Sequence, residues 1–223
     1  MSDHKPTLVE TEAGLTLTDG RLSLTADFTS MLPRLRRGNL QSELLVKAAR
    51  IKGLSRPVRI VDATAGLGED SLLFAAAGFS VRLYESDPVI AALLRDALAR
   101  AAADPQLSDP VSRMVLFEED STLALPQLAG TPDAPDVVYL DPMFPERHKS
   151  GLIKKKFQLL QQLERPCGDE GALMEAALAA KPQRIVIKRP LKGPYLAGVK
   201  PSWSLTGKAI RCDVLVLPEN MGK

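Results

Sequence analysis

The first group of residues that could bind a ligand lies in a glycine-rich stretch, DATAGLGED (62–70). Gly66 and Gly68 allow a tight turn and a close approach of a ligand to the backbone. A dinucleotide-binding loop has a third glycine and places pyrophosphate at the start of the next helix, but that glycine is absent here. Glu69 and Asp70 stand at that point, and their carboxylates would repel pyrophosphate. The loop therefore favours a nucleoside cofactor with a positive centre and no phosphate, such as S-adenosylmethionine.

Acidic side chains also follow the next two apolar segments. The segment VRLYE ends at Glu85, 23 residues after Asp62, where a carboxylate can accept hydrogen bonds from both hydroxyls of a ribose. The segment RMVLFEED ends at Asp120, and the Ser121 hydroxyl beside it can help to bind the amino edge of adenine. Each feature alone is weak evidence, because a single glycine loop is common and an acid after a strand is usually solvated. Their order and spacing together predict a nucleoside cofactor.

A second group of residues, Asp141-Pro142-Met143-Phe144, follows the apolar segment VVYL. It resembles the D/N-P-P-Y/F/W signature of methyltransferases that modify exocyclic amines of nucleic acid bases, with Met143 in place of the second proline. The nitrogen of such an amine is a poor nucleophile, because its lone pair is delocalised into the ring. Hydrogen bonds to the Asp141 carboxylate and to a carbonyl held by Pro142 would localise that pair. Phe144 could stack on a base pulled out of its helix, although these four residues alone fit a plain strand end equally well.

Alternating strand and helix patterns must position these residues. Strands are predicted at 58–62, 81–85, 113–120, 137–140 and 184–188, and two more around Gly207-Lys208. Helices are predicted at 69–77, 87–103, 150–163 and 171–180. This alternation indicates an α/β, Rossmann-like fold with a mostly parallel seven-stranded sheet covered on both faces. Ligands of such sheets bind beyond the carboxyl ends of the strands, which is where the acids lie.

The N-terminal part of the chain has a different pattern. Residues 15–28 alternate apolar and polar around Asp19-Gly20, which predicts a β-hairpin with a two-residue loop. Residues 42–52 read as a helix, in which Leu44, Leu45, Ala48, Ala49 and Ile51 could form a buried stripe. We therefore divide the chain into a hairpin appendage, 1–37, and a methyltransferase-like domain, 38–223.

Composition excludes several classes of protein. The 223 residues are 45% hydrophobic and 25% charged with a net charge of +2, which is ordinary for a globular chain. Cys167 and Cys212 are far apart and lack metal-ligand spacing, so we expect free thiols and no metal. The start of the chain lacks the apolar core of a signal peptide, and no segment approaches the roughly 20 apolar residues of a membrane span. We expect a soluble, cytoplasmic protein without a membrane or metal partner.

Basic residues form clusters that could neutralise nucleic-acid phosphates. The clusters are Arg34, Arg36 and Arg37; Arg147, His148 and Lys149 with the lysines at 154–156; and Lys188, Arg189 and Lys192. A charge run is usually only a solvated face, but the last two clusters follow predicted strands and should flank the cofactor. The predicted substrate-binding residues are Phe144, Arg147, His148, Lys149, Lys188 and Arg189. His148 could be a general base, yet a phosphate or water contact is favoured because a methylated, protonated amine loses its proton readily.

Longer strings are similar to a single family. DATAGLGED, YESDPVIAALLRDALARA, VVYLDPMFPERHKSGLIKKKFQLLQQL and VIKRP resemble the ribosomal RNA small subunit methyltransferase J family, over about residues 15–216. The resemblance implies a Rossmann-like methyltransferase that uses S-adenosylmethionine to methylate the N2 amine of a guanine in small-subunit (16S) ribosomal RNA, either naked or in the assembled subunit. Two alternatives remain: methylation of an amine in another RNA or DNA, and a non-catalytic RNA-binding protein of the same fold.

The resemblance also implies a set of site residues. The expected catalytic residues are Asp141, Pro142 and Phe144. The expected cofactor-binding residues are Asp62, Gly66, Gly68, Glu69, Asp70, Glu85, Ser86, Asp120, Ser121 and Asp141. Members of the family often have Arg where Glu69 and Ser86 stand and Ser where Asp120 stands, and backbone contacts tolerate such changes.

Overall fold

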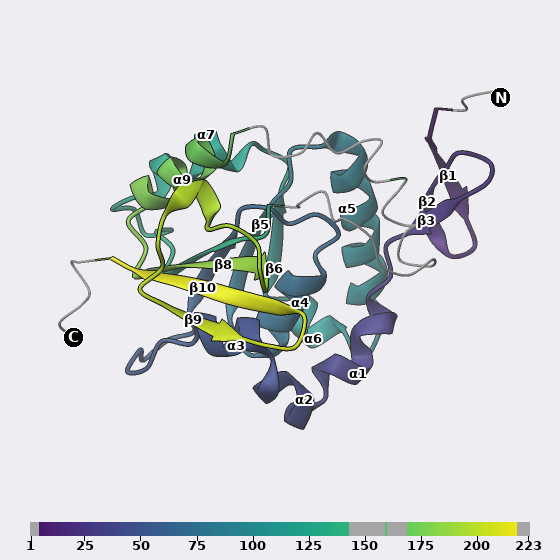
Figure 1. Cartoon of the computed structure of the whole chain (residues 1–223). Coiled ribbons are helices and arrows are strands. Elements are labelled where there is room, and N and C mark those ends of the chain that lie inside the picture. The colour runs from purple at the N-terminus through teal and green to yellow at the C-terminus, as the bar shows by residue number, and fades with distance from the viewer. Residues whose placement is uncertain (1–4, 143–158, 160–168, 218–223) are drawn as a thin grey trace.

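A twisted seven-stranded sheet forms the centre of the computed structural model, which describes residues 5–142, 159 and 169–217 (Figure 1). The strand order is β6-β5-β4-β7-β8-β10-β9. The strands are β4 (Arg59–Asp62), β5 (Ser80–Tyr84), β6 (Met114–Phe117), β7 (Val137–Leu140), β8 (Arg184–Pro190), β9 (Trp203–Thr206) and β10 (Ile210–Val216).

The pairing of the strands confirms the mostly parallel α/β fold. The five strands from β6 to β8 run parallel, and β10 pairs antiparallel with both β8 and β9. The chain leaves β4 outward through β5 and β6, and then returns to the other side of β4 with β7 and β8. The carboxyl ends of β4 and β7 are therefore neighbours at the switch point, where ligands bind in sheets of this kind.

Helices cover both faces of the sheet. The helical elements are η1 (Phe28–Met31), α1 (Leu32–Leu35), α2 (Arg37–Ser42), α3 (Leu44–Ala49), α4 (Glu69–Ala76), α5 (Pro88–Ala102), α6 (Ser108–Val111), α7 (Ser121–Leu128), α9 (Glu170–Ala179) and η2 (Leu196–Gly198). One buried cluster joins one sheet face to α3, α4 and α5, and a second joins the other face to α7 and α9. Successive residues of β7 belong to the two clusters in turn, as the two-residue period of a strand requires, and all four are buried.

Local signals set the starts of the principal helices. The Asp87 carboxylate accepts hydrogen bonds from the backbone N–H groups of Val89 and Ile90, and Pro88 occupies the first turn of α5. Asp120 and Asp169 cap α7 and α9 in the same way. Such caps each contribute about 1 kcal/mol and satisfy N–H groups that have no partner within the helix. The helices predicted at 69–77, 87–103 and 171–180 are confirmed to within a residue at each end.

The helix predicted at 42–52 is wrong in its extent. Glu43 has φ −58° and ψ 127°, which is not helical, and it separates α2 from α3. The Glu43 carboxylate accepts two hydrogen bonds from Arg34, at 2.8 and 2.9 Å. The Arg184 guanidinium donates to the carbonyls of Ala48 and Arg50, where α3 ends. These long-range contacts override a local pattern that continues through the break.

Two other expectations change in detail, and a third is untested. The strand predicted at 113–120 is shorter, because Asp120 already caps α7, a helix that we did not predict. The strand predicted at 184–188 continues to Pro190. The helix predicted at 150–163 lies outside the described residues, apart from Leu159.

The N-terminal hairpin is present as part of a small three-stranded sheet. It comprises β1 (Thr7–Thr11), β2 (Gly14–Thr18) and β3 (Ser23–Thr25) and lies beside α5 (Figure 1). Thr18 pairs with Ser23, so the loop has four residues and the predicted two-residue loop is wrong. The Asp19 carboxylate accepts backbone hydrogen bonds within this loop, which stabilises the longer turn. We retain the division at residue 37 as a proposal.

Gly68, which precedes α4, is enclosed by the packing between α4 and α5. Its φ is +76°, and a Cβ atom placed on it would lie 2.7 Å from Leu94 Cδ1 and 3.3 Å from Phe28 Cζ. Gly130 has a similar φ of +72° but faces open space. The two glycines therefore share a backbone constraint and differ only in packing.

We predict that Gly68→Ala destabilises the protein by about 2 kcal/mol more than Gly130→Ala, because only the first substitution overpacks the core. Both variants carry the cost of a left-handed backbone, about 1–2 kcal/mol. Urea unfolding measures the free energies of unfolding. Equal losses in the two variants would contradict the packing argument.

Candidate active site

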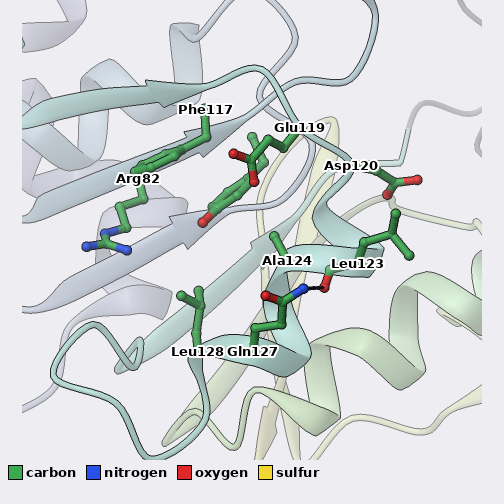
Figure 2. Close-up of a pocket in the computed structure, with 9 residues that line it drawn as sticks. Arg82, Phe117, Glu119, Asp120, Leu123, Ala124, Gln127 and Leu128 are labelled. Carbon is green, nitrogen blue, oxygen red and sulfur yellow. Dashed lines mark hydrogen bonds between the residues drawn. The ribbon is translucent and has the colours of Figure 1, made fainter.

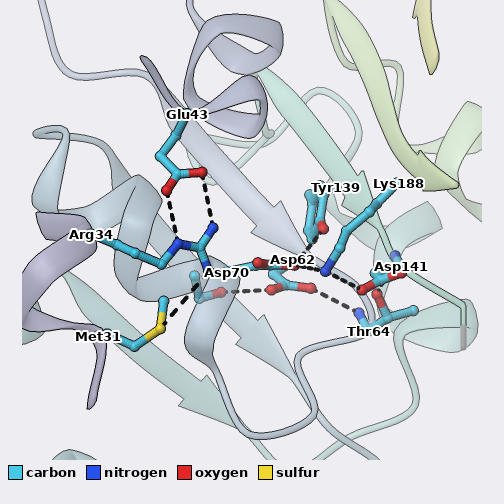
Figure 3. A network of polar contacts seen from close by, with 10 residues as sticks. Met31, Arg34, Glu43, Asp62, Thr64, Asp70, Tyr139, Asp141 and Lys188 are labelled. Carbon is cyan, nitrogen blue, oxygen red and sulfur yellow. Dashed lines mark hydrogen bonds and ion pairs between the residues drawn. The ribbon is translucent and has the colours of Figure 1, made fainter. Parts of the chain in front are cut away.

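Acidic and basic side chains meet at the carboxyl edge of the sheet, as Figure 3 shows. Asp62 is the last residue of β4, and Asp141 directly follows β7. Asp70 lies in the first turn of α4, above the glycine loop, and Lys188 lies in β8. The sheet thus brings together side chains that are up to 126 residues apart in sequence, counted from Asp62 to Lys188.

The ammonium of Lys188 bridges two carboxylates. Its Nζ donates to Asp70 Oδ2 at 2.6 Å and to Asp141 Oδ2 at 2.8 Å. The Tyr139 hydroxyl donates to the same Asp70 oxygen at 2.7 Å. All these groups lie on the α4 side of the sheet. Two donors and two acceptors, from β7 and the residue after it, β8 and α4, are therefore fixed relative to one another.

Burial and charge act in opposite directions on this cluster. Burial alone would lower the pKa of Lys188, but the negative charges of Asp70 and Asp141 outweigh it and raise that pKa above its ordinary value. Burial raises the pKa of Asp141, an effect that the Lys188 charge opposes and the Asp70 charge reinforces. Lys188 therefore remains charged at neutral pH, and its charge favours the ionised form of Asp141.

The glycine loop is tied to the end of β5 through Glu85. The Glu85 carboxylate accepts hydrogen bonds from the backbone N–H of Gly66 at 3.0 Å and of Asp87 at 2.8 Å. Burial raises the pKa of Glu85, and these backbone hydrogen bonds oppose the rise. Gly66 has φ +53°, and a Cβ atom on it would meet nothing within 4 Å. The loop thus presents bare backbone to open space, as the close approach of a ligand requires.

Asp62 supports the loop from beneath. It is 1% exposed, and its carboxylate accepts hydrogen bonds from the Ser71 hydroxyl at 2.6 Å and the Thr64 N–H at 3.1 Å. Burial raises its pKa to about 7, and the Ser71 and Thr64 hydrogen bonds oppose the rise. The Thr64 hydroxyl in turn accepts from the backbone N–H of Asp141 at 2.7 Å. The structure gives Asp62 an internal role in holding the loop, in place of the direct cofactor contact that we predicted.

The residues after β6 link α7 to the same loop. The Ser121 hydroxyl is buried and donates to the Ala63 carbonyl at 2.8 Å. The Asp120 carboxylate accepts from the N–H and the hydroxyl of Thr122 and stays at the surface. Glu69 and Ser86 are exposed at the ends of the neighbouring turns. The cofactor contacts predicted for Asp120, Ser121, Glu69 and Ser86 remain predictions.

The basic residues of β8 are placed differently from our prediction. Arg189 is 1% exposed, its Nε donates to the Pro194 carbonyl at 2.9 Å, and its Nη1 lies 3.5 Å from Glu170 Oε1. A guanidinium buried against α9 cannot reach a phosphate, so the predicted RNA contact of Arg189 is wrong. Lys188 forms ion pairs with Asp70 and Asp141, and its predicted contact with phosphate stays a prediction.

Several predicted residues lie outside the part of the chain that the structure describes. They are Met143, Phe144, Arg147, His148, Lys149, Cys167 and the lysines at 154–156. Asp141 and the buried Pro142 are the last described residues before this gap.

A pocket of about 440 Å³ lies beside the site, between β5, β6 and α7 (Figure 2). Tyr84 and Phe117 stack in it with ring centroids 5.0 Å apart, and Arg82 lies 5.4 Å from the Phe117 centroid. Asp120 is the one predicted site residue in its lining. The lining includes neither the glycine loop nor Asp141.

Two residues of the site were missed by sequence reasoning. Thr64 connects the glycine loop to Asp141, and Tyr139 orients Asp70. Tyr139 could have been found, because the hydroxyl of a tyrosine in a fully buried strand needs a hydrogen-bond partner. The role of Thr64 has no comparable signal, since it depends on the contact between β4 and β7.

Within residues 5–142, 159 and 169–217, no His, Cys, Asp and Glu side chains gather in a group that could hold a metal ion. No helix in these ranges is both long and apolar enough to cross a bilayer. Cys212 is a free thiol in the core, and burial raises its pKa to about 12.

Known proteins resemble this chain over most of its length. The family model described as "Putative SAM-dependent methyltransferase" matches residues 2–217. Ribosomal RNA small subunit methyltransferase J of Neisseria meningitidis is 38% identical over 200 residues, which are 90% of this chain and 79% of the relative. The protein of the same name from Thioalkalivibrio sulfidiphilus is 45% identical over 183 residues, 82% of this chain and 71% of the relative.

A solved structure supports the same assignment. The crystal structure of a SAM-dependent methyltransferase from Neisseria gonorrhoeae matches with a TM-score of 0.77 at 32% sequence identity. The match covers 100% of this chain and 86% of that one. The chain therefore belongs to the ribosomal RNA small subunit methyltransferase J family of SAM-dependent methyltransferases.

Proposed function

We propose that this protein transfers a methyl group from S-adenosylmethionine to the N2 amine of a guanine in small-subunit ribosomal RNA. The observation that carries the proposal is the coupling of Asp141 to the glycine loop. The backbone N–H of Asp141 donates to Thr64 at 2.7 Å, and its carboxylate is held by Lys188 at 2.8 Å. The acid that would accept the amine and the loop that would hold the cofactor thus form one site.

The described residues fit S-adenosylmethionine by charge and by shape. Asp70, Glu85 and Asp141 supply carboxylates around the loop, and the ammonium of Lys188 offsets only part of their charge, which suits a cofactor with a positive centre. The bare backbone of Gly66 faces open space. When bound, the cofactor supplies a methyl group on a sulfonium leaving group. Gly66, Glu85 and the residues after β6, Asp120 and Ser121, would hold it.

The protein would act mainly by orienting the amine. One N–H of the guanine amine donates to the Asp141 carboxylate and the other to a backbone carbonyl next to Pro142, whose ring fixes the local backbone. These bonds direct the nitrogen lone pair at the methyl group, and positioning of this kind can lower a barrier by several kcal/mol. The nitrogen would become positively charged as the N–CH₃ bond forms and the S–CH₃ bond breaks, with a neutral thioether as the leaving group, and the nitrogen would then lose one proton to water. No dedicated base is needed, because the protonated amine is acidic.

The RNA would be held by exposed basic residues. Arg36 and Arg37 are exposed on α2 and its N-terminal side, close in sequence to Arg34. Arg147 and Lys149 are proposed for the same purpose from the sequence alone. We propose the cytoplasm as the location, because ribosomal RNA is found there.

The substrate is tested with small ribosomal subunits from a strain that lacks the gene, incubated with the protein and radiolabelled S-adenosylmethionine. We expect label in small-subunit RNA and recovery of N2-methylguanine after digestion. Naked small-subunit RNA and duplex DNA serve as competing substrates. Label in a different methylated base would support another amino-methyltransferase, and no label in any nucleic acid would support the non-catalytic alternative.

The role of Asp141 is tested by Asp141→Asn, which keeps the shape of the side chain and removes its charge. We expect kcat to fall by about 10²–10³-fold, because a charged, preorganised acceptor of the transition state is replaced by a neutral amide that accepts more weakly. Asp133→Asn, at an exposed acid paired with Arg82, is the matched control and should leave kcat unchanged. Wild-type kcat in the folded Asp141→Asn variant would overturn the mechanism.

Close approach of the cofactor to the loop is tested by Gly66→Ala. A methyl group in the open space above Gly66 should raise the Kd of S-adenosylmethionine by about tenfold or more, a loss of about 1.4 kcal/mol. Calorimetry measures the affinity, and Gly130→Ala controls for the left-handed backbone. An unchanged Kd in Gly66→Ala would show that the cofactor does not approach the loop there.

A further inference from the structure

We propose that Lys188 is a positioning residue for methyl transfer, which holds one oxygen of Asp141 so that the other faces the target amine. The proposal rests on the proposed function, because it gives Asp141 the role of amine acceptor. It assigns to Lys188 a task inside the site, away from the RNA phosphates that it was predicted to bind.

The strand register places the two side chains side by side. Leu140 at the end of β7 pairs with Ile187 of β8 in a parallel ladder. Asp141 and Lys188 are the next residues along each strand, so both side chains emerge at the same level and on the same face. The distance of 2.8 Å between Lys188 Nζ and Asp141 Oδ2 follows from this register. The Lys188 hydrogen bond uses Oδ2 of Asp141, so the proposal assigns the target amine to Oδ1.

A second element fixes the ammonium from the opposite side. Asp70, in the first turn of α4, accepts from Nζ at 2.6 Å and is itself held by the Tyr139 hydroxyl at 2.7 Å. The Lys188 side chain is 26% exposed, and those of Asp70 and Asp141 are 16% and 30% exposed. A long, flexible side chain is therefore fixed at its charged end by two partners. The position of the Asp141 carboxylate therefore depends, through Lys188, on the position of α4 and of the glycine loop before it.

The charge of Lys188 also keeps Asp141 in the form that accepts hydrogen bonds. Burial and the neighbouring Asp70 raise the pKa of Asp141, and Lys188 is the principal group that lowers it. A protonated Asp141 would offer a hydroxyl donor at one oxygen and accept poorly. Without Lys188, the ionised acid would form only at higher pH, so the rising limb of the pH–rate profile would move upward. The described titratable or charged groups around Asp141 and Lys188 are Asp62, Asp70, Tyr139, Arg189 and Cys212.

The test compares Lys188→Met, Lys188→Gln and Lys188→Arg with wild type, using single-turnover methyl transfer to small subunits between about pH 6 and 9.5. We expect Lys188→Met to be at least about tenfold slower at pH 7, with the rising limb displaced by about one to three pH units. Lys188→Gln keeps hydrogen-bond donors without charge and should show the same displacement. Lys188→Arg keeps the charge and should retain the wild-type profile. Burial also raises the pKa of Asp62 to about 7, but Asp62 is present in all four proteins and cannot cause a difference between their pH profiles.

Two further measurements separate positioning from stability. Thermal unfolding of each variant shows whether it is folded, and Lys188→Gln serves if Lys188→Met is not. Lys47→Met, at an exposed lysine of α3, is the matched control and should match wild type in rate and profile. If the pH–rate profiles of both Lys188→Met and Lys188→Gln were unshifted, the role of Lys188 would be overturned, even if the rates of both variants fell at every pH. If wild type itself transfers no methyl group, the proposed function fails, which is a different result.

Discussion

Asp70 and Asp141 bring two carboxylates to one ammonium, that of Lys188, at the carboxyl edge of a buried sheet. Two partly buried carboxylates repel each other and lose hydration, and the pKa of an unpaired one rises. A single cation between them removes the repulsion and fixes both. The other features of the site depend on this arrangement, because it allows acids to be gathered where a cationic cofactor and an amine are to meet.

The sheet supplies the geometry for this contact, and the loops refine it. Parallel pairing of β4, β7 and β8 aligns their carboxyl ends, so that Asp62, Asp141 and Lys188 lie at one edge. Thr64 joins the loop after β4 to the backbone after β7, and Glu85 joins the same loop to the end of β5. Each of these links crosses from one strand end to another. The site is therefore assembled by the core, and its precision depends on the packing of β7, whose four residues are all buried.

Local patterns predicted much of this architecture. Strands followed by acids and helices preceded by Asp are short-range signals, and the strands and helices that carry Asp62, Glu85 and Asp141 lie where those signals placed them. The glycine loop was identified from residue types alone. The helix at 42–52 failed because its break depends on Arg34, which forms an ion pair with Glu43 from outside the segment. The pattern of residues 42–52 alone does not contain the position of Arg34.

The basic pair Lys188-Arg189 shows another limit of sequence reasoning. Two adjacent basic residues after an apolar segment look like an exposed surface cluster. In the structure β8 continues to Pro190, so the pair lies within the strand and its side chains point to opposite faces. Lys188 meets the acids of the α4 face, and Arg189 is buried near Glu170 of α9. Because the predicted strand ended two residues too early, both side chains were expected on the surface, whereas the structure places them on the two faces of the sheet.

The charge state of Lys188 tests the account most directly. An NMR titration that follows the side-chain Cε resonance of Lys188, assigned by comparison with Lys188→Arg, would measure its pKa in the folded protein. We predict that it titrates above the ordinary lysine value of about 10.4, because Asp70 and Asp141 stabilise the ammonium. A pKa at or below that value would show that the ammonium is not held between two carboxylates, and would contradict the site described above.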